Sequence, residues 1–385
     1  MGKMPKTDEK PPNHAYQKTA LVLQGGGALG AYQAGVYESL DAHGIYPDWF
    51  AGVSIGAVNA AIMAGNPPEK RIEKLKSFWQ EITETLFDYP NSFQDFFPPQ
   101  TYMAYSSLMS MTCGIPGFFA PRILPPIWLS PVSGQNAVSY YDTSPLRDTL
   151  LKHADFERIN DGNVRLSLGA VNVRTGNSLY FDNKNQTLTP EHVMASGALP
   201  PGFPPVEIDG ECYWDGGLVS NTPLTYVLSD PEDADTLIFQ VDLFSAVGDL
   251  PKSIDTVEER RKDIVYSSRT RLNTDAFRKD YELKEAITHL ATHLPPDKRN
   301  DPAISKLINM GASRKISIVH LIYRPEDWEG ASKDYEFSNR SMDRRWQAGL
   351  ADGRQTCKQT GWRTLPSDED GIAVYDLTPP HQPKA

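Results

Sequence analysis

The stretch TALVLQGGGALG, residues 19–30, passes from a short apolar run directly into closely spaced glycines. Small and apolar residues then recur at helical spacing over residues 31–42. A second apolar run at 49–53 leads through Ser54 into another stretch of small residues at 55–64. Each unit has the pattern of a strand that turns sharply into a helix, so the sequence predicts an α/β fold.

The remainder of the chain continues this alternation and then becomes mainly helical. Expected helices cover residues 71–86, a segment opened by Ser144 and Pro145, the charged stretch 255–293, and 338–358. Expected strands cover 164–173, 178–181, 237–243 and 316–323, with a hairpin turn at 174–177. The sequence has no internal repeat and no clear linker, which favours one α/β domain with a C-terminal extension.

Residues 87–141 interrupt this pattern, because they are rich in Pro, Phe, Tyr, Met and Ser and lack periodicity. Such a stretch is long for a structureless loop, which favours a functional or partly helical segment. It could form a lid or the wall of an acyl-chain pocket, or it could be ordinary core and loop packing. The candidates for lipid contact are Phe118, Phe119, Ile127, Trp128 and Leu129.

Charge and cysteine content limit the classes of partner and the compartment that we expect. The chain has 385 residues and a formal net charge of −11. This charge argues against nucleic acid as a partner, because phosphate binding needs a concentrated positive face. The three cysteines, Cys113, Cys212 and Cys357, form no metal-ligand pattern and cannot all pair within the chain, which favours a reducing compartment.

The N-terminal residues 1–18 are polar and predict a disordered tail rather than a secretory signal. The most apolar stretch, 113–132, is interrupted by prolines and does not predict a plain membrane-spanning helix. We therefore expect a cytoplasmic protein and leave peripheral contact with a membrane open.

Residues 52–56 have the G-x-S-x-G form of a nucleophile elbow, in which a serine occupies a strained turn between a strand and a helix. A side chain at Gly52 or Gly56 would crowd that turn. The N-terminus of the following helix favours the negative charge that develops during ester attack. Five-residue matches also arise by chance, so the predicted strand and helix on either side are what favour Ser54 as the nucleophile.

The glycine loop consists of Gly25, Gly26, Gly27 and Gly30 and admits more than one interpretation. It fits the G-x-G-x-x-G pattern of dinucleotide-binding loops, but their acidic residue should close the second strand, whereas Asp48 precedes that strand. We prefer a loop whose backbone N–H groups, together with that of Ile55, stabilise a tetrahedral oxyanion. A glycine turn that only packs a helix on a strand is the plainer alternative.

Asp215, Gly216 and Gly217 place a carboxylate on a turn after a strand-like segment, which alone is a common sequence. Together, the three motifs resemble the patatin-like phospholipase family, whose members combine a glycine-rich oxyanion loop, an early G-x-S-x-G and a later Asp-Gly-Gly or Asp-Gly-Ala. The similarity runs from about residue 19 to 243 and includes AYQAGV at 31–36, ASGALP at 195–200 and NTPL at 221–224. The segment YEFSNRSM at 335–342 resembles the C-terminal extension of one bacterial branch.

This resemblance implies a three-layer α/β/α sandwich with a central, mostly parallel sheet and a mainly helical C-terminal extension. It divides the chain into a disordered tail at 1–18, a catalytic domain at 19–245 with 87–141 as a lid or insert, and an extension at 246–385 that ends in a disordered tail. One departure is Leu29, because many relatives carry Arg or Lys at this position. Backbone donors would then stabilise the oxyanion without a nearby cation.

The resemblance also implies a serine acyl hydrolase that cleaves carboxylic ester bonds of lipids and needs no metal or other cofactor. In the implied Ser-Asp dyad, Asp215 accepts the proton of Ser54 directly and an acyl-serine forms. We expect burial to raise the pKa of Asp215 and so make it a better base. The expected partner is a lipid or another ester substrate, and the oligomeric state is not predicted.

Alternative functions remain open at this stage. An α/β-hydrolase triad in the order Ser, Asp, His is allowed by His289, His293, His320 and His381, although none of them falls at an obvious strand-to-loop junction. A non-catalytic lipid-binding protein of the same fold is opposed by the joint presence of Ser54 and Asp215. A nicotinamide-dependent oxidoreductase would use the glycine loop instead.

Overall fold

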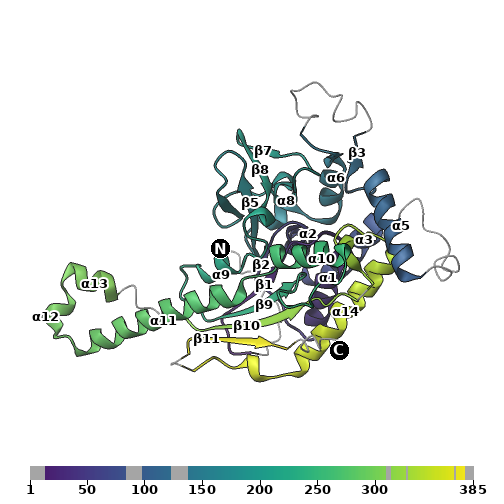
Figure 1. The fold of residues 1–385 in the computed structure, drawn as a ribbon. Coiled ribbons are helices and arrows are strands. Elements are labelled where there is room, and N and C mark those ends of the chain that lie inside the picture. Colours follow the sequence, from purple (N-terminus) through teal and green to yellow (C-terminus); the bar gives the residue numbers. More distant parts are fainter. Residues whose placement is uncertain are drawn as a thin grey trace.

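A computed structural model describes residues 14–83, 98–122, 138–308, 314–326, 328–367 and 370–377, and Figure 1 shows the fold. Much of the predicted N-terminal tail, the end of the predicted C-terminal tail and parts of the predicted lid lie outside these residues. The lipid-contact candidates Ile127, Trp128 and Leu129 are among them.

A central sheet organises the molecule. Among the described residues it has nine strands, in the order β11-β10-β9-β1-β2-β5-β8-β7, with β6 paired to β5. The strands are β1 (Lys18–Leu23), β2 (Trp49–Gly52), β5 (Arg165–Asn172), β6 (Ser178–Asp182), β7 (Val206–Ile208), β8 (Glu211–Asp215), β9 (Thr236–Asp242), β10 (Ile316–Ile322) and β11 (Ile372–Asp376). Neighbours from β11 to β5 run parallel, whereas β6, β7 and β8 add antiparallel pairs. The mostly parallel sheet is as predicted.

Alternate side chains of the central strands enter two separate cores, because successive residues of a strand point to opposite faces. In β1, Leu21 and Leu23 pack with α1 (Gly30–Ala42), α2 (Ile55–Ala64), α3 (Pro68–Thr83) and α14 (Asn339–Lys358). Ala20 and Val22 pack with α9 (Leu224–Leu228) and with Phe277 of α11 (Thr270–His293). Helices therefore cover both faces, and the predicted α/β/α sandwich is confirmed (Figure 1).

The predicted strand-to-helix units agree closely with the structure. The helix after Ser54 has the predicted bounds, Ile55–Ala64, and the hairpin of β5 and β6 forms across residues 174–177. The helix expected to be capped by Ser144 includes that residue, and Thr143 is its N-cap instead.

The irregular segment 87–141 is partly helical where it is described. It contains α5 (Pro99–Cys113) and the short antiparallel pair β3 (Ala120–Pro121) and β4 (Tyr141–Asp142). It is followed by α6 (Ser144–His153) and α7 (Phe156–Asn160), whereas α8 (Pro190–Ser196) comes after the β5–β6 hairpin. In Figure 1, α6, α8 and β3 lie on the side of the molecule that holds β5, β7 and β8, away from β10 and β11.

The C-terminal region, predicted to be mainly helical, also extends the sheet. It contributes α10 (Ile254–Tyr266), α11, α12 (Pro296–Arg299), α13 (Pro302–Ile308) and α14, together with β10 and β11, which continue the sheet beyond β9. The predicted boundary between residues 245 and 246 falls between β9 and α10, so both sides supply strands to one sheet. Figure 1 shows α11, α12 and α13 projecting from the body.

Helix α14 packs closely on α1 because glycines allow the two backbones to approach. A β-carbon at Gly35 would lie 2.0 Å from the carbonyl oxygen of Trp346, and one at Gly349 would lie 2.0 Å from that of Tyr32. Neither position can hold a larger side chain without moving backbone, so these two glycines fix how the C-terminal helix sits on the first helix.

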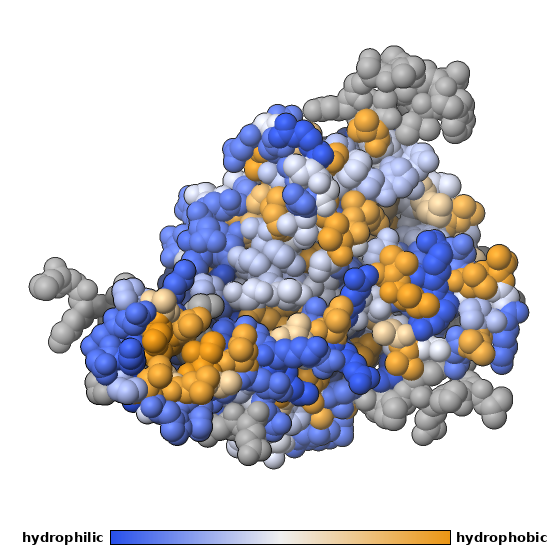
Figure 2. Space-filling model, turned by 60° about the vertical axis from the view of Figure 1, so that its left-hand side comes forward, coloured by the Kyte–Doolittle hydropathy of each residue, from blue (hydrophilic) through white to orange (hydrophobic). Residues whose placement is uncertain are grey.

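The surface carries interleaved hydrophobic and hydrophilic patches on the face shown in Figure 2. Large exposed apolar side chains include Val247, Leu250, Ile254, Ile264 and Val265 in and before α10, and Leu272, Leu283 and Leu290 in α11. Within the described residues, we find no helix with the length and hydrophobicity required to span a membrane.

Candidate active site

Ser54 lies at the turn between β2 and α2 in a strained backbone conformation, with φ 55° and ψ −125°. Such a conformation is costly for a residue with a side chain and is concentrated at functional sites. A β-carbon at Gly52 would lie 2.3 Å from the carbonyl oxygen of Gly56, and one at Gly56 would lie 2.4 Å from that of Leu23. The G-x-S-x-G glycines are therefore required by close backbone approach, as predicted for a nucleophile elbow.

Ser196 supports this elbow from α8. The Ser54 N–H donates to both the carbonyl oxygen and the Oγ of Ser196, each at 3.1 Å. The Ser196 hydroxyl in turn donates to the carbonyl oxygen of Gly169 at 2.6 Å and is fully buried. Ser196 thus ties the turn to β5, which is a structural role.

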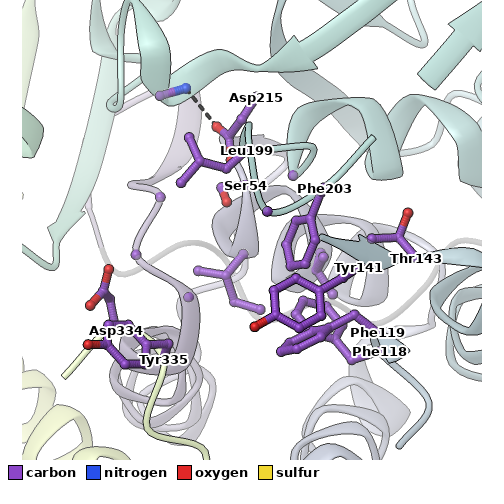
Figure 3. Close-up of a pocket in the computed structure, with 18 of the residues that line it drawn as sticks. Ser54, Phe118, Phe119, Tyr141, Thr143, Leu199, Phe203, Asp215, Asp334 and Tyr335 are labelled. Carbon is purple, nitrogen blue, oxygen red and sulfur yellow. Dashed lines mark hydrogen bonds between the residues drawn. The ribbon is translucent and has the colours of Figure 1, made fainter. Parts of the chain in front are cut away.

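Asp215 is the last residue of β8 and is buried, with 2% of its surface exposed. The Gly217 N–H donates to its Oδ1 at 2.7 Å, and the Ser54 side chain lies close enough to its carboxylate to favour the charged form. Burial raises the pKa of Asp215 to about 7, against the lowering effect of Gly217 and Ser54. The structure thus brings Ser54 and Asp215 together from strands on either side of β5 (Figure 3).

The glycine loop lies beside this pair, but its N–H groups are not equivalent. The Gly25 N–H donates to the carbonyl oxygen of Asn221 at 3.1 Å and is therefore engaged. Gly26, Gly27 and Ile55 donate no backbone hydrogen bond to another described residue. Of the four N–H groups predicted to stabilise the oxyanion, those of Gly26, Gly27 and Ile55 are not engaged by other described residues. The Gly25 N–H instead anchors the loop to Asn221.

Asn221 is a site residue for which the sequence suggested no role. Its Nδ2 donates to the carbonyl oxygens of Gly25 and Tyr266, both at 3.0 Å. A β-carbon at Gly25 would lie 2.3 Å from Asn221 Oδ1, and one at Gly217 would lie 2.9 Å from it. A side chain at either glycine would therefore displace Asn221, which joins the glycine loop to the Asp215 turn.

A network of buried, hydrogen-bonded polar side chains supports the glycine loop. Trp79 Nε1 donates to Asn59, Asn59 donates to Gln33, and Gln33 donates to the Gln24 carbonyl oxygen, at 3.0, 3.0 and 2.7 Å. Gln24 Oε1 accepts the N–H groups of residues 243 and 244. Buried polar groups that are satisfied in this way specify one arrangement of the backbone. The sequence feature that signals this network is Gln24, a polar residue directly after the apolar strand β1.

A cavity of about 450 Å³ opens at Ser54 and Asp215. Its aromatic wall consists of Phe118, Phe119, Tyr141, Phe203 and Phe337, whose neighbouring ring centroids lie 4.8–6.4 Å apart. Figure 3 shows four of these rings together on one side of the pocket. Phe118 and Phe119, which were candidates for lipid contact, do line the cavity.

The C-terminal region supplies the opposite side of the cavity. Tyr266, Asp334 and Tyr335 line it together with Phe244, which follows β9. In Figure 3, Asp334 and Tyr335 lie across the pocket from the aromatic rings. No role for this region was predicted, because these side chains are far from the three motifs along the chain.

The alternatives raised by the sequence find little support in the geometry. Of the described residues that line the cavity, none is a histidine. His320 pairs instead with Asp242 at 2.6 Å, and His289 and His293 are exposed on α11. His381 lies outside the described residues.

Asp48 is not placed to bind a ribose. Its carboxylate accepts the Thr19 N–H at the start of β1, whereas the glycine loop follows the other end of that strand. A dinucleotide site needs its acidic residue at the carboxyl end of the second strand. In the described part of the chain, moreover, no three His, Cys, Asp or Glu side chains are grouped to hold a metal ion.

Comparisons with known proteins agree with this arrangement. The model of the family described as patatin-like phospholipase matches residues 21–228, and a second model, described as patatin phospholipase, matches residues 264–369. Triacylglycerol lipase SDP1L of Arabidopsis thaliana is 46% identical over 50 residues, which are 13% of this chain and 6% of that protein.

Among solved structures, VipD from Legionella pneumophila aligns over 90% of this chain and 67% of its own, with 14% identity and a TM-score of 0.40. The first family model alone covers more than half of the chain. The chain therefore belongs to the patatin-like phospholipase family.

Proposed function

We propose that this protein is a lipid acyl hydrolase that cleaves carboxylic esters with Ser54 as nucleophile and Asp215 as general base. The observation that carries the proposal is the contact of a strained serine with a buried carboxylate whose pKa is raised to about 7, both of which line a largely apolar cavity. A base with a pKa near the working pH accepts and returns protons efficiently.

In the proposed first step, Ser54 Oγ attacks the ester carbonyl carbon while its proton passes to Asp215. The carbonyl oxygen becomes an oxyanion that accepts hydrogen bonds from the N–H groups of Gly26, Gly27 and Ile55. When the intermediate collapses, the bond to the alcohol breaks and Asp215 returns its proton to the leaving oxygen. The product of this half-reaction is an acyl-serine and a free alcohol.

The second half-reaction repeats these steps with water. Asp215 takes a proton from the water as it attacks the acyl-serine, and the same N–H groups stabilise the second oxyanion. Collapse breaks the bond to Ser54 Oγ, which regains its proton from Asp215, and the fatty acid leaves. Donors of this kind are worth about 2.7–4 kcal/mol each when deleted.

The cavity supports an ester with an apolar acyl chain as the substrate. The rings of Phe119, Tyr141 and Phe203 lie within 4.8–6.1 Å of one another beside Ser54, which would remove an acyl chain from water. The relative from Arabidopsis is named as a triacylglycerol lipase. Glycerides and phospholipids both present the required ester.

The test is hydrolysis of p-nitrophenyl esters of increasing chain length by the wild type, Ser54→Ala and Asp215→Asn. The account predicts no serine-dependent turnover for Ser54→Ala and a roughly 10²- to 10⁴-fold loss of kcat for Asp215→Asn. His192→Gln is a matched control, because His192 is buried on α8 but does not line the cavity. Hydrolysis retained by Ser54→Ala would refute the proposal, and a folded but inactive histidine variant would favour a triad.

A further inference from the structure

The segment Glu329–Phe337 is held by ion pairs on two sides. From α10, Lys262 binds Asp334 at 2.7 Å, and the buried Lys333 binds Glu259 and Asp263 of the same helix at 3.1 and 2.8 Å. From α14, the buried Arg345 binds Glu329 at 3.1 Å and the Glu336 carbonyl oxygen at 2.9 Å. Ion pairs therefore fix this segment, and the buried Phe337 anchors its end in the hydrophobic core.

Helix α10 contacts this segment through ion pairs. None of its residues is buried, and its apolar side chains Ile254, Ile264 and Val265 face solvent. Its charged side chains Glu259, Lys262 and Asp263 are directed instead toward the segment. The charged face is thus the one that α10 uses to pack on the protein.

The segment in turn touches the glycine loop. The Asp334 carbonyl oxygen accepts the Ala28 N–H at 2.8 Å, and a β-carbon on Gly27 would lie 2.0 Å from that same oxygen. Gly27 has φ 54°, a conformation that this contact helps to hold. The hydrogen bond fixes the peptide plane that joins residues 27 and 28. The Asp334 carbonyl oxygen also lies against the Cα of Gly27, so it limits the φ and ψ changes that would turn the Gly27 N–H.

Lys262 is the side chain that fixes Asp334. Its Nζ donates to both carboxylate oxygens of Asp334, at 2.7 and 3.0 Å, and to the Ala331 carbonyl oxygen at 2.9 Å. It also lies 4.8 Å from the centre of the Tyr335 ring. The pair is partly buried, with side-chain exposures of 20% and 22%, so solvent screens it less than a surface pair.

We propose that Lys262 is a positioning residue of the active site, which acts through Asp334 to hold the Gly26 and Gly27 amides in place to stabilise the oxyanion. This inference rests on the proposed function and gives the C-terminal region a part in the reaction. Lys262 touches no reacting atom. It sets the geometry of the donors, and misplacing such groups by about 1 Å can cost about 10² in rate.

The test compares Lys262→Met, Lys262→Arg and Asp334→Asn with Arg261→Met in the full-length protein. Arg261 is the matched control, because it is the next residue on α10 and its side chain pairs with Glu258 in solvent. We expect Lys262→Met to lower kcat roughly ten- to a hundredfold with little change in KM. Lys262→Arg should recover part of this loss, and Arg261→Met should behave as wild type.

Hydrogen–deuterium exchange of the peptide covering residues 24–30 gives a readout independent of turnover. The account predicts faster exchange at Ala28 in Lys262→Met and in Asp334→Asn, but not in Arg261→Met. Asp334→Asn keeps the main-chain carbonyl and the size of the side chain, so it tests the contact even if Lys262→Met fails to fold.

Unchanged exchange together with unchanged kcat in both variants would overturn the role of Lys262. An equal loss in Arg261→Met would do so as well, because it would indicate a general effect of α10. Failure of the proposed function is distinguished by Ser54→Ala, which would then retain hydrolysis whatever the exchange at Ala28.

Discussion

Two opposing effects act on the ionisation of Asp215. It is almost completely buried, which disfavours its charged form, whereas the Gly217 N–H and the nearby Ser54 favour that form. Burial prevails and raises its pKa from the usual 3.8 to about 7. A carboxylate near its usual value would be a weak base, so this environment is what makes a two-residue mechanism feasible without a histidine.

The activity should follow the ionisation of Asp215. Only the carboxylate can accept the Ser54 proton, so kcat/KM should rise about tenfold per pH unit below the pKa and level off above about pH 7. Steady-state hydrolysis of a soluble ester between pH 5 and 9 checks this. A profile that is flat across that range would contradict Asp215 as the base.

The ionisation of Asp215 should also make the free energy of unfolding depend on pH. A raised pKa means that the folded protein binds this proton more tightly than the unfolded chain, so wild-type stability is lost as the pH rises from about 4 to about 7. Asp215→Asn does not titrate and should gain stability relative to wild type at pH 8 but not at pH 4, by at most about 4 kcal/mol. Urea unfolding at the two pH values measures this. A difference independent of pH would contradict the raised pKa.

At the residue scale, the sequence could indicate the motifs but not all of their contacts. The pattern around Ser54 follows from local sterics, and the structure places it as expected. The engagement of Gly25 could not be predicted, because its partner is a main-chain carbonyl at Asn221, far along the chain. The contact of Asp334 with Ala28 is likewise a main-chain bond that no residue type signals.

Among the elements, the pairing of α1 with α14 is the most constrained. Gly35 and Gly349 let the helices approach so closely that a β-carbon would overlap backbone oxygens. This contact positions α14, whose Arg345 holds Glu329 and the segment beside the active site. The packing of α14 on α1, although far from Ser54, therefore helps to position the segment beside the active site.

Gly349→Ala should destabilise the protein by roughly 3 kcal/mol, because interiors resist added volume and the clash is with backbone. Urea unfolding measures the change. Gly361→Ala is the control, since its β-carbon would meet its nearest neighbour, Tyr375, at 3.6 Å, an ordinary contact. Equal stability of the two variants would contradict the close packing of α1 and α14.

Element prediction succeeded where periodicity was strong. The units β1 to α1 and β2 to α2 combine buried apolar strands with glycine turns, and both were expected. The strand β11 was not expected, because it is short and lies at the sheet edge, where Ile372 is the one buried residue of its five. The half-exposed strand β7 gave a similarly weak signal, whereas the strand-like segment expected before Asp215 forms β8.

At the scale of the molecule, the two regions matched by the family models form one sheet. Strand β9, which lies between the two matched regions, is fully buried and pairs with β1 on one side and with β10 on the other. The C-terminal region also lines the cavity with Tyr266, Tyr335 and Phe337. Fold and site therefore both depend on it.

A chain that ends after residue 249 should not fold. It would expose the edge of β9 and the face of α1 that α14 covers, and exposed strand edges promote aggregation. Circular dichroism and thermal unfolding of the purified fragment check this. A soluble fragment with a cooperative transition would contradict the dependence on the C-terminal region.

The central claim is that the Ser54 hydroxyl is activated by Asp215 alone. Labelling with a fluorophosphonate, followed by intact and peptide mass spectrometry, tests it most directly, because the reagent reacts only with an activated serine. The account predicts one adduct on Ser54, at least a hundredfold slower labelling in Asp215→Asn and an unchanged rate in His192→Gln. An adduct that persists in Ser54→Ala, or labelling of Asp215→Asn at the wild-type rate, would contradict it.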